Sequence, residues 1–210
     1  DVGCEARYGE DAKHDFNESI APDERSELVQ QCTWMYISQR IGSLAGDDDW
    51  FPKGLEPGHG GSKSSHRQKC DDPQAGMYLH WGCRVDCRDT RDPIALAESQ
   101  REGLAQMKPD LDELRERGWS IHLAPKLGVR ESRRILGEHV ITADDLIEGR
   151  VPDDSVYCTM RGFDLWRKGK DQMSAYPPVK PYGIPYRALV PRGVDGLFVV
   201  GKAMSGTHLA

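Results

Sequence analysis

The sequence predicts an α/β fold, in which helices and strands alternate along the chain, and three observations support this. Residues 29–38 (VQQCTWMYIS) combine β-branched and aromatic residues, as a half-buried strand does. A helical pattern of apolar residues follows Asp92 and Pro93. The all-apolar run at 197–200 precedes a glycine-bounded loop, which is typical of a parallel strand buried on both faces.

The composition is that of a folded protein rather than a disordered one. Of the 210 residues, 38 % are hydrophobic, and five Trp, seven Tyr and four Phe supply aromatic side chains for a core. The net charge of −6, without a basic stripe, is unlike that of a nucleic-acid binder. The sequence contains neither a run of about 18 apolar residues that could span a membrane nor an opening signal peptide. We expect a soluble protein with no nucleic-acid partner.

The cysteines say little about compartment or metal. Six cysteines in a chain of this length are too few for a disulfide scaffold. The compartment is unknown; a cytoplasmic protein with reduced thiols is slightly favoured, and a periplasmic or secreted protein with one or two disulfides is the alternative. Cys83 and Cys87 lack the second cysteine pair that zinc and iron–sulfur sites usually have, so we expect no metal site.

The first half of the chain is expected to contain a long loop followed by a helix. Residues 42–72 are rich in Gly, Ser, Pro and Asp, as in a lid or substrate loop. Asp92 is the expected N-cap of the helix and Gly118 its stop, while Pro109 should kink it or split it in two. The apolar stripe expected to face the core consists of Ala97, Leu104, Met107, Leu111 and Leu114.

The second half should contain further short elements. Strands are predicted at 119–124 and 135–141, and a capping box at 142–145 should start a short helix. Residues 207–210 look like the first turn of another helix. Because a buried strand at 197–200 would need helices packed against it, we expect the chain to be an interior piece of a longer protein.

The arrangement of strand, glycine, loop and helix around residues 197–210 suits an electron-rich ligand. Backbone N–H groups at a helix start point outward, and the helix dipole adds partial positive charge. In many flavoproteins such a turn lies against the flavin, where it stabilises negative charge near N1 and O2 of the reduced ring.

Residues 181–210 (PYGIPYRALVPRGVDGLFVVGKAMSGTHLA) resemble a late conserved segment of the FAD-dependent oxidoreductase family related to the fumarate reductase and succinate dehydrogenase flavoproteins. Residues 128–146 (GVRESRRILGEHVITADDL) are similar to a second signature of the same family, and residues 1–3 are a weaker third match. These matches follow one another in the family's order and span almost the whole chain.

The resemblance implies a partial Rossmann-like FAD-binding domain interrupted by a mixed-sheet (α+β) substrate domain. Residues 1–15 would end the first FAD segment, 16–180 would form the substrate domain, and 181–210 would return to the FAD domain. The G-x-G-x-x-G turn that cradles the FAD pyrophosphate is not found in the sequence and would precede residue 1. The glycines at 58–61 do not follow a strand, so they do not supply it.

The resemblance also implies the cofactor-binding residues. They are Asp1, Gly201, Lys202, Ala203, Met204, Ser205, Gly206 and Thr207. Lys202 stands where relatives usually have Arg, which keeps the charge but loses the planar fork. Trp166 stands where many relatives have His, so any catalytic role of that His would be absent here.

The candidate catalytic residues are Arg130, Arg133, Arg134 and His208. In an extended segment Arg130 and Arg134 share one face, from which an arginine could clamp a substrate carboxylate or face the flavin. The alternative is a structural ion-pair network that joins the two domains. His208 could approach the reactive face of the flavin, or it could be a helix-start histidine without chemistry.

The function implied is that of an FAD-dependent oxidoreductase, which passes hydride between an unidentified small organic substrate and flavin N5. An unidentified electron acceptor would reoxidise the flavin, and the fragment alone is expected to be inactive and to bind FAD weakly. The alternatives are a non-catalytic binding module derived from such an enzyme, or one half of a split flavoenzyme with a complementary N-terminal half. A homo-oligomer is a further possibility.

Overall fold

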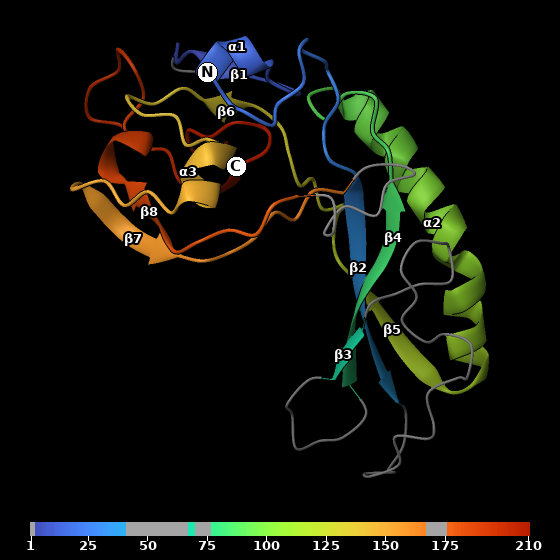
Figure 1. Cartoon of the computed structure of the whole chain (residues 1–210). Helices are drawn as coiled ribbons and strands as arrows, with labels where there is room; N and C mark the ends of the chain where they lie inside the picture. The colour runs from blue at the N-terminus through green and yellow to red at the C-terminus, as the bar shows by residue number, and fades with distance from the viewer. Residues whose placement is uncertain (1–2, 41–66, 70–76, 167–175) are drawn as a thin grey trace. The chain divides into compact units, whose positions relative to one another are not determined.

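The computed structural model describes residues 3–40, 67–69, 77–166 and 176–210 (Figure 1). The chain divides into two compact units. Unit 1 consists of Asp1–Gln30, Arg88–Arg91 and Glu131–Ala210, and unit 2 consists of Gln31–Cys87 and Asp92–Arg130. This division by compactness assigns neither unit to a flavin or a substrate domain, so the domain boundaries expected from the resemblance stay a prediction.

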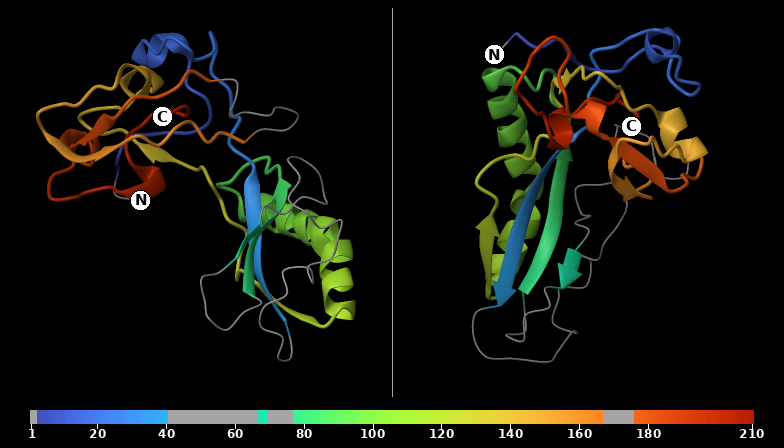
Figure 2. Two further views of the ribbon diagram at one scale, coloured as in Figure 1. Left: turned by 60° about the horizontal axis from the view of Figure 1, so that its bottom comes forward. Right: turned by 90° about the vertical axis from the view of Figure 1, so that its left-hand side faces the viewer.

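Unit 2 is a four-stranded antiparallel sheet with one long helix against it (Figure 2). The strand order is β3-β4-β2-β5, and the helix α2 spans Pro93–Glu116. The strands are β2 (Cys32–Arg40), β3 (Arg67–Lys69), β4 (Met77–Val85) and β5 (Trp119–Leu123). The strands predicted at 29–38 and 119–124 are therefore confirmed as β2 and β5. Apart from β3, the predicted 42–72 loop lies outside the described residues.

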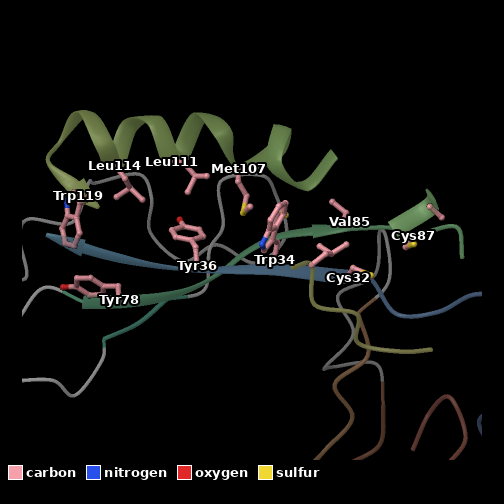
Figure 3. Packing of buried hydrophobic residues seen from close by; sticks show 13 residues of the cluster. Cys32, Trp34, Tyr36, Tyr78, Val85, Cys87, Met107, Leu111, Leu114 and Trp119 are labelled. Atoms are coloured by element: carbon pink, nitrogen blue, oxygen red, sulfur yellow. The ribbon is translucent and has the colours of Figure 1, made fainter. Parts of the chain in front are cut away.

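The core of unit 2 lies between α2 and the sheet, where Trp34 and Tyr36 of β2 meet Met107, Leu111 and Leu114 of α2 (Figure 3). Alternate residues of a strand point to the same face, so these β2 side chains line up beneath the helix. Cys83 and Cys87 are free thiols inside the same core, and burial raises the pKa of Cys83 to about 11. A thiol that stays protonated at neutral pH serves packing rather than reactivity.

The ends of α2 are as predicted, but two features of its interior are not. The Asp92 side chain accepts a hydrogen bond from Ile94 N at 2.9 Å, and Gly118 has the positive φ of +82° that ends a helix. The predicted split at Pro109 is wrong, because α2 runs through it. Proline removes one helical hydrogen bond, and the buried turns on either side of it keep the helix intact.

The predicted apolar stripe of α2 is wrong in its N-terminal half. Ala97 and Leu104 are exposed, whereas Ala95, Ser99 and Gly103 are buried. Small residues let the helix approach the sheet: a Cβ at Gly103 would lie 2.8 Å from Cys83 Sγ. Close backbone packing, rather than hydrophobicity, decides which face of this half of the helix is buried.

Unit 1 is built from short elements. Two two-stranded antiparallel sheets pair β1 with β6 and β7 with β8. The strands are β1 (Ala6–Arg7), β6 (Arg134–Ile135), β7 (Ser155–Thr159) and β8 (Tyr182–Pro185). The helices are α1 (Lys13–Phe16), α3 (Ala143–Glu148), and the 3₁₀ turns η2 (Tyr186–Ala188) and η3 (Gly201–Ala203). An apolar cluster that includes Ile141, Leu146 and Tyr182 forms its core.

The capping box predicted for α3 is confirmed, because Thr142 N donates to Asp145 Oδ2 at 2.8 Å and Asp145 N donates to Thr142 Oγ1 at 3.4 Å. The strand predicted at 135–141 is observed only as the two-residue strand Arg134–Ile135. The helix predicted at 207–210 is a loop whose Ala210 N donates to Thr207 O at 3.3 Å. A single bond of this kind is too little to nucleate a helix.

The buried strand predicted at 197–200 is also wrong. Phe198 is 56 % exposed and Val200 69 % exposed, and the segment pairs with no described strand. Val199 N donates to Leu189 O at 2.9 Å, so the segment is held by a loop. An apolar run becomes a buried strand only where neighbouring strands accept its backbone hydrogen bonds.

The observed fold mixes helices with small antiparallel sheets, which agrees with the α/β class in its coarse form. None of the helices in the described residues is long and apolar enough to cross a membrane.

Replacing Gly82 by Ala should destabilise unit 2 by about 3 kcal/mol, because the residue has a positive φ and its Cβ would clash. The φ of Gly82 is +55°, and the added Cβ would lie 1.9 Å from Trp34 O. Denaturant unfolding followed by tryptophan fluorescence measures the effect, since Trp34, Trp81 and Trp119 all lie in unit 2.

The matched control is Gly118→Ala, where φ is +82° but the added Cβ meets nothing within 4 Å. This substitution should lower the free energy of unfolding by only about 1 kcal/mol, which is the strain of a left-handed conformation in alanine. Equal losses in the two variants would contradict the close approach at Gly82.

Candidate functional site

The segment predicted to bind the cofactor forms an exposed turn with a buried end. Gly201 and Lys202 are exposed, whereas Ser205 and Thr207 are each 1 % exposed. Gly201 has a φ of +68°, and no atom lies within 4 Å of where its Cβ would be. The turn therefore offers backbone and the Lys202 side chain to its surroundings, while its second half is built into unit 1. Asp1, also predicted to bind the cofactor, lies outside the described residues.

Hydrogen bonds to the 139–141 segment hold the buried end of the turn. Ser205 Oγ donates to His139 O at 2.6 Å. Thr207 N donates to Ile141 O at 2.9 Å, and Ile141 N donates to Ser205 O at 3.2 Å. The two backbone bonds form a short parallel bridge between Ile141 and Gly206. The hydroxyl of Ser205 is thus directed into the protein, and the contacts left for a cofactor come from the exposed half of the turn.

Beneath the turn lies a buried charge network centred on Arg134. Its Nη2 donates to Asp11 Oδ2 and to Gly9 O, both at 2.8 Å, and its Nε donates to Gly206 O at 3.1 Å. Its Nη1 donates to Glu131. One guanidinium therefore joins three parts of the chain that are far apart in sequence. The residues Asp11, Glu131 and Arg134 are each at most 5 % exposed.

His208 completes the network. Its Nδ1 lies 2.8 Å from the Glu131 carboxylate, and its backbone N donates to Asp11 Oδ2 at 3.0 Å. Because an ionised carboxylate can only accept, Nδ1 carries the hydrogen in this pair. The imidazole is 4 % exposed, so its position is set by these contacts inside unit 1.

A third buried acid, Glu18, contacts the same turn. Its Oε1 accepts from Thr207 Oγ1 and from Ala143 N, both at 2.6 Å. Burial raises the pKa of Glu18, and the like charges of Asp11 and Asp144 add to this, although the two hydrogen bonds act in the opposite direction. Asp11 and Glu18 were not predicted from the sequence. They lie in a polar N-terminal segment without a motif, and their partners are more than a hundred residues away.

The four predicted catalytic residues are not equivalent in the structure. Arg134 and His208 come together in the buried network, whereas Arg133 is exposed. Arg130 belongs to unit 2 and is half-buried. The extended alternation expected for this segment does not hold, because Glu131 and Arg134 are buried together. The ion pairs of Arg134 lie within unit 1. A catalytic role for any of the four residues stays a prediction, and so does the alternative of an ion-pair network that joins the two domains.

A separate polar groove of about 450 Å³ opens in unit 1. It lies beside α1 and α3, with Lys13, Phe16, His139 and Arg150 among its lining residues. Its acids are largely engaged: Asp144 accepts from Ser19 N at 2.8 Å, and Asp145 accepts from Arg150 Nη1 at 2.9 Å. None of the predicted site residues lines this groove.

Comparison with known proteins gives one match. The family model described as FAD dependent oxidoreductase matches residues 2–210, which is nearly the whole chain. No curated protein and no solved structure matches. The relation to the fumarate reductase flavoproteins stays an expectation from the resemblance.

Replacing Arg134 by Met should destabilise unit 1 by about 3–5 kcal/mol, because Asp11 and Glu131 would be left buried without their cation. Hydrogen exchange of backbone amides in unit 1, measured by mass spectrometry against denaturant, gives the change in the free energy of unfolding.

Arg133→Met is the matched control, since Arg133 is a neighbouring but exposed arginine. It should change the stability by less than about 0.5 kcal/mol. A loss of similar size in both variants would contradict a structural role specific to Arg134.

Proposed function

The chain belongs to the FAD dependent oxidoreductase family, and on this premise we propose that it acts in hydride transfer between a small organic substrate and the N5 atom of the flavin. FAD is the cofactor of this family. An unidentified electron acceptor would complete the cycle. The observation that carries the proposal is the exposed turn at 201–207, which the family match covers and which unit 1 holds from beneath.

The residues of the turn fit an electron-rich ligand. The space beside Gly201 is open, so a planar ring could approach the backbone without a side chain between them. Lys202 places an ammonium on the exposed part of the turn. A cation there favours negative charge that develops on a neighbouring group. The buried hydroxyls of Ser205 and Thr207 orient the turn and are not available to the ligand.

When bound, FAD supplies the redox chemistry by accepting or donating hydride. The chain's own part is positioning and electrostatics. Lys202 would place a positive charge near the electron-rich edge of the cofactor. The Ser205–His208 segment would keep the turn in place as the charge of the cofactor changes. Preorganised groups of this kind need no rearrangement during the reaction.

We also propose the domain organisation that the resemblance implies, a Rossmann-like FAD domain made of residues 1–15 and 181–210 and interrupted by a substrate domain at 16–180. The bond between His208 N and Asp11 supports a common domain for the two flanking pieces. Unit 1 also contains residues 131–180, so the substrate domain would contribute to the packing around the turn.

The visible absorption spectrum of the protein purified from its native source tests the cofactor. Bands near about 370 and 450 nm are expected, because oxidised protein-bound flavins absorb there. A colourless but folded protein would contradict the oxidoreductase function and favour a non-catalytic binding module.

Replacing Lys202 by Gln should lower the midpoint potential of the bound flavin by roughly 30 mV, which for two electrons corresponds to about 1.4 kcal/mol. The reason is that a positive charge near the ring stabilises the reduced form. Spectroelectrochemical titration measures the shift, and Lys202→Arg is the control that keeps the charge. A Gln variant with the wild-type potential would place Lys202 away from the flavin.

A further inference from the structure

Glu18 occupies a position that packing alone does not explain. It follows α1, is 1 % exposed, and uses one oxygen, Oε1, to accept from both Thr207 Oγ1 and Ala143 N. Removing a carboxylate from water is costly unless hydrogen bonds replace the lost hydration. An apolar side chain of similar volume would avoid the cost, as it does for many buried ionic groups.

The buried carboxyl group of Glu18 holds the end of the turn by a hydrogen bond to Thr207. Thr207 is 189 residues away in sequence, and its hydroxyl lies 2.6 Å from the carboxylate. The same oxygen holds the first residue of α3, so α3 and the turn are fixed to one point. Breaking a hydrogen bond between buried groups is costly, because no water replaces the lost partner.

A second acid from the N-terminal segment, Asp11, holds His208, the residue that follows Thr207. Asp11 Oδ2 accepts from His208 N at 3.0 Å, while Arg134 holds Asp11 in place at 2.8 Å. Acids from the first twenty residues therefore hold two successive residues at the end of the turn. Thr207 is held through its side chain and His208 through its backbone. Gly201 and Lys202 lie in the exposed half of the same turn, and Met204 N donates to Gly201 O at 3.0 Å, so this half continues directly into the anchored end.

We propose that Glu18 is a positioning residue for the cofactor-binding turn, acting through the hydroxyl of Thr207 to fix where Gly201 and Lys202 lie. This inference rests on the proposed function for its meaning. The clamp itself, which consists of the hydrogen bonds from Thr207 Oγ1 and Ala143 N to Glu18 Oε1, does not depend on that function. It adds a residue from the opposite end of the chain to the site, with a role distinct from contact with the cofactor.

The clamp should also respond to pH. The groups that face Glu18 are the Ala143 N–H, the Thr207 hydroxyl and the carboxylates of Asp11 and Asp144, with Arg134 and His208 beyond Asp11. Burial raises the folded-state pKa of Glu18 above its ordinary value of 4.5. The folded state therefore holds the proton more tightly than the unfolded state, and stability falls as pH rises from about 4.5 through the raised pKa.

The direct test compares Thr207→Val, which keeps the shape but removes the hydroxyl, with Thr207→Ser, which keeps the hydroxyl. Hydrogen–deuterium exchange of peptides covering 201–210 is measured on the full chain. The Val variant should exchange roughly tenfold faster there, since a hydrogen bond to a buried carboxyl group is lost. The Ser variant should stay close to wild type, and peptides from α2 should be unchanged in both.

The pH profile is the second measurement, because a residue that only fills space would not alter it. The free energy of unfolding is measured from pH 4 to 8 in wild type, Glu18→Gln and Glu24→Gln. Glu24 is an exposed acid of the same segment and controls for the change in charge. The decline that begins near pH 4.5 should be smaller in Glu18→Gln than in the other two proteins.

The outcomes separate this inference from the proposed function. Unchanged exchange at 201–210 in Thr207→Val would overturn the clamp, even in a protein that binds flavin. The same slope of stability with pH in Glu18→Gln and wild type would overturn it as well. Faster exchange in Thr207→Val with rescue in Thr207→Ser supports the clamp, and a colourless wild-type protein would then overturn only the proposed function.

Discussion

The buried guanidinium of Arg134 is the interaction on which the described part of unit 1 depends most. It lies between the carboxylates of Asp11 and Glu131 and also donates to the backbone at Gly9 and Gly206. The described residues of unit 1 form only short strands and helices, so they offer no long backbone ladders to hold its segments together. Charge-assisted hydrogen bonds at one point replace them. A buried ion pair gives modest net stability, but it penalises strongly any arrangement in which a partner is missing.

This constraint explains why the turn at 201–207 is fixed at one end and exposed at the other. Gly206 and His208 are tied to the network, and Thr207 is tied to Glu18. Gly201 and Lys202 extend beyond these contacts and face outward. A site built in this way can present backbone groups and one cation to a cofactor, while the buried network fixes their position before the cofactor binds.

Features that depend on neighbours in sequence could be predicted, and features that depend on distant residues could not. The Asp92 cap, the Gly118 stop and the capping box at Thr142 need only local chemistry, and all three are confirmed. The motifs at 128–146 and 181–210 likewise gave the family, because each is continuous in sequence.

The failures of prediction have one physical origin. The run at 197–200 is apolar, but its sequence does not say whether a neighbouring strand is present. Asp11 and Glu18 gained their roles from residues 197 and 189 positions away, which no local pattern records. Arg134 was singled out as one of several arginines, yet only the folded chain distinguishes it from exposed Arg133.

The most direct test of the network is a double-mutant cycle between Asp11 and Arg134, using Asp11→Asn, Arg134→Met and the pair of substitutions together. Our account predicts that the double variant is less destabilised than the sum of the single variants, with a coupling energy of about 2 kcal/mol or more. An exposed pair such as Glu113 and Arg117, at the C-terminal end of α2, should give no more than about 0.5 kcal/mol in the same experiment. Additive effects at Asp11 and Arg134 would contradict the central role of this ion pair.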